Sequence, residues 1–338
     1  MSYVPNMLKA MKTNVNIHKA AGKSHGSGIS LLELVTKFPY EDAARRRFEA
    51  IIWTDGRVCP NRGSDDTHEP THAKMPCRCR ACKRYFSVKT GTVMAQSSIP
   101  LVNWVYAIYL DVSSLKRVSS MKLHRGLGIT AMTARFMQQR IRVAFDAGGP
   151  QVLFEGPVEV DETYLGGKAK NMHANKRREK THGRAPVGKT AVVGVKDRET
   201  NKVAAKVVEN VHAATLVEFV DDHAEIDATV YTDGSTLYSG RSAHEAVHHS
   251  VGENVRGKGN RNDVESFWSM LKRAHQGTFH RLSANHLHRY VAEFCGHHNI
   301  RDLDTAKRMA HTVAAMGGRR LTYDVLAVGP EGVAVEPW

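Results

Sequence analysis

The fold class of this chain is decided by the stretch Val158-Glu159-Val160-Asp161-Glu162-Thr163-Tyr164-Leu165. It opens a series of short runs rich in β-branched and apolar residues, which are typical of strands. A run with helical character separates the third strand from the fourth, and further helical runs follow the last strand. This order predicts an α/β fold with a mixed layer of strands and helices. The predicted strands are 158–160, 190–195, 203–208, 228–231 and 246–251, and the predicted helices are 213–224, 264–273 and 284–294.

Changes in composition on either side of this layer divide the chain into parts. Gly148-Gly149-Pro150 separates a helical region from the β-rich runs and marks a domain boundary. We expect, in order, a flexible basic arm, a helix with a cysteine-rich module, a helical region, an α/β domain and a C-terminal tail. These parts span residues 1–28, 29–95, 96–150, 151–305 and 306–338. Within the α/β domain, we expect residues 166–189 to form a basic loop between the first two strands.

The charge of the chain indicates a polyanionic partner. Its 338 residues include 48 Lys and Arg against 34 Asp and Glu, which is a formal net charge of +14. Such an excess of basic side chains favours binding to nucleic acid. No stretch of about 20 apolar residues is present, so we expect no membrane span. The N-terminus has no apolar signal core, so we expect a cytoplasmic rather than a secreted protein.

The cysteines form a cluster that favours metal binding. Four of the five lie between residues 59 and 82, and disulfides are rare in proteins that are not secreted. Cys79-Arg80-Ala81-Cys82 is a C-x-x-C knuckle, and thiolates at that spacing can hold one Zn²⁺ from a tight turn. Cys59 begins a similar stretch upstream, but Arg62 stands where the second thiol is expected.

The sequence leaves the fourth ligand of this zinc site open, because a closed structural site needs four. The alternative is a degenerate module that no longer binds metal. In the zinc hypothesis, the ligands are Cys59, Cys79, Cys82 and one of Cys77 or His72, with His68 also available.

The segment 118–134 in the helical region resembles a helix-turn-helix. Leu123 and Leu127 fall on one face of the first helix, Gly128 supplies the turn, and Thr130 caps the second helix. In such motifs the second helix enters the major groove of DNA, and here it carries Arg135 at an exposed position. The alternative is an ordinary pair of packed helices.

Three acidic residues far apart in the sequence are the candidate catalytic residues. Asp161 ends the apolar run 158–160, Asp233 follows the run 228–232, and Glu265 opens a later helix. Singly, each has an ordinary explanation: a surface carboxylate, an Asp-Gly turn, and a capping box that begins at Asn262. Together, two strand ends and a helix can bring three carboxylates to one point, and such hard oxygen ligands suit Mg²⁺ or Mn²⁺.

Neighbours of these acids refine the prediction. Strand alternation puts Asp161 and Glu162 on opposite faces, so only one of them is expected to face a shared site. Lys272 follows Glu265 by two helical turns on the same face and could hold a phosphate of DNA beside the metal. An exposed Lys without such a role is the alternative. We expect Trp268 to pack the helix rather than to stack on a base.

With these residues in view, the chain resembles bacterial insertion-sequence transposases of the zinc-ribbon group related to eukaryotic Merlin elements. The resemblance implies an RNase H-like catalytic domain with a DDE-type triad at Asp161, Asp233 and Glu265. It also implies a basic residue at Lys272 and keeps Asn262 as an alternative ligand. The family's zinc ribbon has Cys where this chain has Arg62. The matching segments are 53–60, 79–86, 89–92, 160–168, 232–234, 262–273 and 286–299.

The resemblance therefore predicts a DNA transposase. Its partners would be the terminal inverted repeats of the element and target DNA, and it would work as a homo-oligomer that pairs two ends. We expect it in the bacterial cytoplasm, on the nucleoid when bound to DNA. The alternatives are a DNA-binding regulator or domesticated remnant without catalysis, and an RNase H-like nuclease that cuts without joining.

Overall fold

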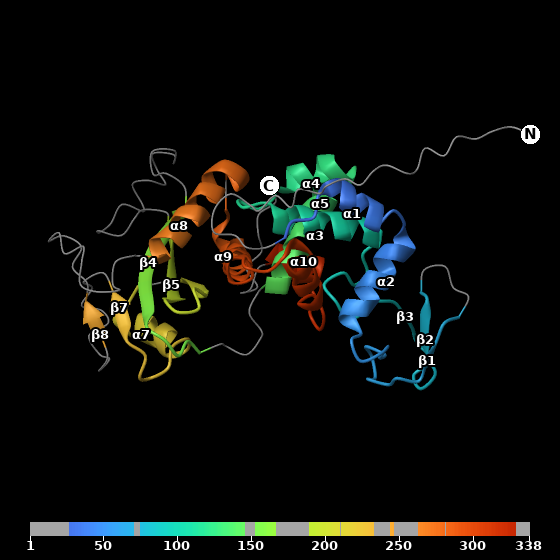
Figure 1. The fold of residues 1–338 in the computed structure, drawn as a ribbon, viewed down its shortest axis with the longest axis horizontal. Helices are drawn as coiled ribbons and strands as arrows, with labels where there is room; N and C mark the ends of the chain where they lie inside the picture. The colour runs from blue at the N-terminus through green and yellow to red at the C-terminus, as the bar shows by residue number, and fades with distance from the viewer. Residues whose placement is uncertain are drawn as a thin grey trace, which may run out of the picture.

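The structure is a computed structural model of the chain. One end of the molecule holds a five-stranded sheet and the helices that cover it, the middle is a group of helices, and the other end holds a small three-stranded sheet (Figure 1). The residues that the structure describes are 27–70, 75–145, 153–166, 189–209, 211–232, 244–246, 263–280 and 282–328.

The larger sheet confirms the predicted α/β layer. Its strand order is β6-β5-β4-β7-β8, with β5 antiparallel to β4 and to β6, while β7 runs parallel to β4 and to β8. The predicted basic loop lies almost wholly outside the described residues. The strands are β4 (Val158–Gly166), β5 (Lys189–Asp197), β6 (Val203–Val208), β7 (Val230–Thr232) and β8 (His244–Ala246).

Strand β4 is longer than predicted, and this corrects the expectation that Asp161 ends its strand. Asp161 is an interior residue of a nine-residue strand. The reason is tertiary, because β5 pairs with β4 along its whole length, from Val158 opposite Asp197 to Gly166 opposite Lys189. The described parallel pairing with β7, however, ends at Val160 opposite Thr232. Asp161 therefore lies just beyond that pairing.

Each face of this sheet is covered by a different set of helices. Val158 and Val160 of β4 face α7 (Ala213–Asp221), whose Leu216, Phe219 and Val220 complete one apolar core. The other face packs against α8 (Asp263–Ala274) and α9 (Ala284–Asn299), with Leu165 of β4 in a second core. A π-helical turn, His275–Phe279, extends α8. The alternation of β4 thus separates two buried cores.

The helical region has its own core, and the predicted pair of helices joined by a turn is present. Helix α4 ends at Gly128, whose φ of 64° lies in the left-handed region that glycine adopts readily. The Thr130 hydroxyl accepts the amide of Thr133 at 3.1 Å and so caps α5 as predicted. The helices are α1 (Leu31–Lys37), α2 (Glu41–Ile52), α3 (Leu101–Ser113), α4 (Ser120–Leu127) and α5 (Ala131–Phe145).

The chain after residue 305 contributes more than the expected tail. Helix α10 (Thr305–Ala314) packs against α2, α3 and α5, and it is followed by the short helix α11 (Tyr323–Val328). Val313 and Met316 are buried in the same core as Trp104 of α3. The helical core is therefore built from both ends of the described chain.

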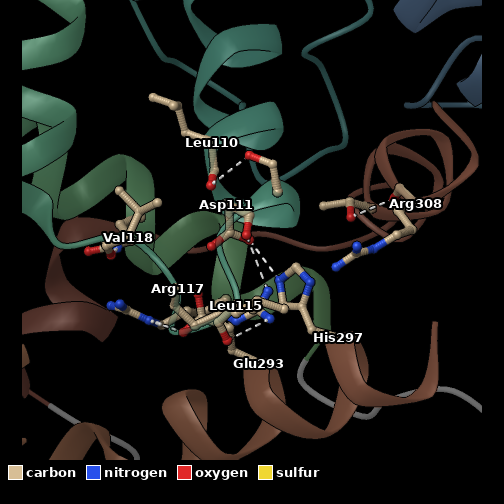
Figure 2. A network of polar contacts seen from close by, with 12 residues as sticks. Leu110, Asp111, Leu115, Arg117, Val118, Glu293, His297 and Arg308 are labelled. Atoms are coloured by element: carbon tan, nitrogen blue, oxygen red, sulfur yellow. Dashed lines mark hydrogen bonds and ion pairs between the residues drawn. The ribbon is translucent and has the colours of Figure 1, made fainter. Parts of the chain in front are cut away.

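A buried polar network joins the helical region to the α/β domain (Figure 2). Arg142 of α5 and Glu293 of α9, of which Glu293 is labelled in Figure 2, form an ion pair of 2.9 Å with side chains 1% and 0% exposed. Burial lowers the pKa of His297 well below its usual value, so the neutral ring donates from Nε2 to a carboxylate oxygen of Asp111 on α3 at 2.7 Å. Helix α9 thus holds both α3 and α5 through buried polar contacts.

Candidate active site

Asp161 faces the side of the sheet that α8 covers. Its cross-strand partner on β5 is Gly194, and directly paired residues project to the same face of an antiparallel pair. A Cβ built on Gly194 would lie 2.6 Å from Cζ2 of Trp268, so the indole of α8 occupies the space above this pair. The half-buried Asp161 carboxylate also accepts the amide of Glu162 at 2.8 Å through Oδ1.

Glu265 lies at the start of the helix that covers this face. The buried stripe of α8 consists of Val264, Phe267, Trp268, Leu271 and Ala274, which confirms that Trp268 packs the helix. Glu265 precedes Trp268 by one turn and is exposed, as is Lys272. Both side chains are therefore free of the apolar core, on the helix that covers the Asp161 face.

The other two predicted residues of the acidic site, Asp233 and Asn262, lie outside the described residues. The nearest described residue before Asp233 is Thr232, which pairs with Val160 next to Asp161. The structure brings the strand of Asp161 and the helix of Glu265 into contact, and the roles of all four residues stay predictions.

Sequence reasoning missed Glu159, which contacts both α8 and a loop after β5. This carboxylate accepts Nε of Arg198 at 2.7 Å through Oε1 and the amide of Val264 at 3.4 Å through Oε2. Strand alternation does place Glu159 on the same face as Asp161, so a signal for its position was available. No local pattern marks Arg198 as its partner.

Three of the predicted zinc ligands lie together in the cysteine-rich module. The sulfur atoms of Cys59, Cys79 and Cys82 all lie within 4.8 Å of one another, and Sγ of Cys59 is 3.7 Å from Sγ of Cys82. Thiolates around a tetrahedral Zn²⁺ at about 2.3 Å have their sulfur atoms about 3.8 Å apart. The spacing of these thiols therefore fits a zinc ion.

A closed zinc site needs a fourth ligand, and the structure does not add either predicted candidate to the three clustered cysteines. Cys77 is buried on strand β2 with Cys79, but it is not a member of the group of three sulfur atoms. His72 lies outside the described residues, and Arg62 is exposed on the turn that begins at Cys59. The module is formed by β1 (Thr67–His68), β2 (Cys77–Cys79) and β3 (Tyr85–Phe86).

The surroundings of Cys79 and Cys77 differ in a way that favours Cys79 as a metal ligand. The backbone amide of Cys82 donates to Sγ of Cys79, and this hydrogen bond lowers the pKa of the Cys79 thiol. Burial raises the pKa of the Cys77 thiol. Because the thiolate is the metal-binding form, Cys79 is better prepared than Cys77 to bind Zn²⁺.

The exposed part of the helix-turn-helix is the first half of α5 and the outer face of α4. Met132 is 62% exposed and Arg135 is also exposed. Further along α5, Arg140 and Arg142 are buried, so they are not available to a DNA groove. Residues at the start of the second helix are the ones that reach base edges in such motifs.

A second group of three potential metal ligands consists of Asp111, Glu293 and His297 in the buried network. Burial raises the pKa of Asp111, and Arg117, Arg142 and Arg308 oppose that rise by stabilising its charged form. Guanidinium groups thus already supply the positive charge around these carboxylates. We interpret this group as a structural ion network rather than as a metal site.

Comparison with known proteins identifies the class of the α/β domain. Residues 154–295 match the ISXO2-like transposase domain family, a range that includes the sheet, α8 and most of α9. This match confirms the resemblance to insertion-sequence transposases of this group over residues 154–295.

A relative in Halobacterium salinarum is similar over both halves of the chain. It is 29% identical over 255 residues, which cover 71% of this chain and 84% of the relative. The relative is described as an uncharacterized protein in the transposable element ISH50. Within the described residues, no helix is long and apolar enough to cross a membrane.

Proposed function

We propose that this protein is a DDE-type DNA transposase, which cleaves DNA at the ends of an insertion sequence and joins those ends to target DNA. The observation that carries the proposal is the common placement of Asp161 and α8 on one face of a mixed sheet, within the residues that match a transposase domain. The mixed pairing of the strands, with helices on both faces, supports an RNase H-like core.

In this proposal Asp161, Asp233 and Glu265 hold divalent metal ions, Mg²⁺ or Mn²⁺, with Asn262 as an alternative ligand. The described members of the set offer hard carboxylate oxygens, which fit these ions. Bound ions would supply Lewis-acid stabilisation of the attacking and leaving oxygens of a phosphodiester. The exposed Lys272, two turns after Glu265, would hold a phosphate of the DNA by its charge.

The remaining parts of the chain would bind and select DNA. The net charge of +14 supports sequence-independent affinity for the backbone, which falls steeply with added salt. Selection of the terminal inverted repeats would come from α4 and the first half of α5, because base edges are read in the groove. The cysteine module would be a zinc ribbon with Cys59, Cys79 and Cys82 as ligands and a fourth from Cys77 or His72.

The pairing of two element ends requires two active sites, so we propose a homo-oligomer as the active form. The rival functions differ in their products. A regulator or domesticated remnant would bind the ends without cutting them. A nuclease with the same fold would cut them without producing strand-transfer product.

The experiment that tests the proposal is a Mg²⁺-dependent cleavage and strand-transfer assay on labelled end DNA, with Asp161→Asn, Asp233→Asn and Glu265→Gln variants. We expect each variant to keep end binding and to lose both reactions. Asp227→Asn is a matched control, because Asp227 is an exposed acid before the opposite end of β7. Full cleavage by Asp161→Asn in Mg²⁺ would refute the assigned role.

A further inference from the structure

One buried carboxylate contacts elements that lead to all three candidate catalytic acids. Glu159 is 5% exposed and lies two residues before Asp161 on the same face of β4. Its two oxygens accept different donors: Oε1 accepts Nε of Arg198 at 2.7 Å and Oε2 accepts the amide of Val264 at 3.4 Å. The Glu159 side chain thus connects β4 to the loop after β5 and to α8 by hydrogen bonds.

The contact with Val264 fixes the beginning of α8. The first amides of a helix have no partner within the helix, and a carboxylate there is favoured by the helix dipole. Val264 lies in the first turn, directly before Glu265. The hydrogen bond to Glu159 therefore holds the start of this helix against the strand that carries Asp161.

The contact with Arg198 extends this connection to β7. The Arg198 guanidinium lies 3.9 Å from the centre of the Tyr231 ring. The backbone amide of Arg198 donates to the carbonyl of Pro157 at 3.0 Å. Tyr231 is the direct partner of Glu159 in the parallel pairing of β4 and β7. The guanidinium that pairs with Glu159 therefore also contacts β7, the strand that precedes Asp233.

From these contacts we infer that Glu159 is a positioning residue for the proposed metal site. It sets the separation of the acidic ligands by holding β4, β7 and α8 against one another. We assign it to the support of the acidic ligands rather than to the ligand set, because it is buried and its two oxygens accept hydrogen bonds from Arg198 and Val264. The inference rests on the proposed DDE function and names a residue outside the triad.

The test is a titration of the full-length protein with Mn²⁺ alone, followed by calorimetry, for wild type, Glu159→Gln and Arg198→Met. Loss of residues that orient metal ligands typically weakens metal affinity by about 10- to 100-fold. We expect a loss of about tenfold in Mn²⁺ affinity for both variants, a higher Mg²⁺ requirement for cleavage, and unchanged end binding without metal. Arg198 is partly exposed, so its variant avoids the risk that Glu159→Gln does not fold.

Glu293→Gln is the matched control for stability. Glu293 is also buried and paired with an arginine, but it lies in the network between α3, α5 and α9. We expect this variant to unfold more easily and to keep wild-type Mn²⁺ affinity. The buried Lys196 lies opposite Glu159 in the pairing of β4 and β5 and would keep its charge beside a neutral Gln in Glu159→Gln, so stability and Mn²⁺ affinity are both measured for each protein.

The outcomes separate this inference from the proposed function. Wild-type Mn²⁺ affinity in both Glu159→Gln and Arg198→Met would overturn the positioning role while leaving the triad intact. Equal weakening by Glu293→Gln would overturn it too, because the effect would then follow from stability alone. A wild-type protein that neither binds Mn²⁺ nor cleaves end DNA would overturn the proposed function and this inference with it.

Discussion

Replacing Glu293 with Leu should destabilise the protein strongly, because Arg142 would keep a buried charge without its partner. The pair is 2.9 Å long, and the two side chains are 1% and 0% exposed. Breaking a fully buried pair from one side typically costs about 3–5 kcal/mol. The stacking of Arg142 on Tyr290, 3.8 Å from the ring centre, is present in both proteins and does not offset this loss.

The expected loss lies at the lower end of that range. Asp111 also attracts Arg142 and would still supply part of the missing negative charge. We therefore expect the free energy of unfolding to fall by about 3 kcal/mol in Glu293→Leu. The double variant Arg142→Met/Glu293→Leu should recover most of the loss, because it leaves no unpaired charge and fills a similar volume.

The assay is equilibrium urea unfolding of the full-length variants, followed by circular dichroism and tryptophan fluorescence. Asp66→Asn is the control, since the pair of Asp66 with Arg80 is exposed and should contribute less than about 1 kcal/mol. A loss below about 1 kcal/mol in Glu293→Leu would show that Arg142 is not left as a buried uncompensated charge. A double variant as unstable as the single one would also refute the reasoning.

Three further predictions concern packing, metal and pH. Gly194→Val should lower stability by about 1–3 kcal/mol in thermal unfolding, because its Cβ would overlap Trp268; an unchanged melting temperature would contradict this close packing. Purified protein should contain zinc, and Cys82→Ser should lower the zinc content, whereas Cys295→Ser should not, because Cys295 is buried outside the group of three. Equal zinc content in the wild type and both variants would exclude the site. Because burial lowers the pKa of His297 in the folded state, the unfolded state takes up a proton first as the pH falls below about 6.5, so stability is retained above that pH and lost below it. His297 should contribute about 1–2 kcal/mol to the fall in the free energy of unfolding from pH 7 to pH 5, so the fall should be smaller by that amount in His297→Gln; an equal slope in both proteins would contradict it.

Local sequence patterns were sufficient to predict most of the secondary structure. The strand 203–208 was predicted with the observed ends, and the turn at Gly128 and the cap at Thr130 were predicted together. These features depend on alternation, glycine conformation and side-chain capping within a few residues, so they can be read without knowledge of distant contacts. The cysteine knuckle at Cys79 and Cys82 belongs to the same class.

The acidic site itself stays a prediction, although the structure describes two of the elements that would form it. The sequence identified Asp161 and Glu265 as candidates, and the structure brings their strand and helix together on one face of the sheet. It could not show that β5 would extend β4 beyond Asp161, because strand length depends on the partner strand. Asp233 and Asn262 lie outside the described residues, so their roles stay predictions.

By itself the sequence determined the order of strands and helices in the α/β layer, the basic character of the chain and the residue types available for metal binding. Only the tertiary structure decided which of these residues meet. Glu159 meets the start of α8, and Arg142 pairs with Glu293 across 151 positions of sequence. The physical reason is that such contacts follow from the packing of whole elements, and neither partner carries a local pattern that names the other.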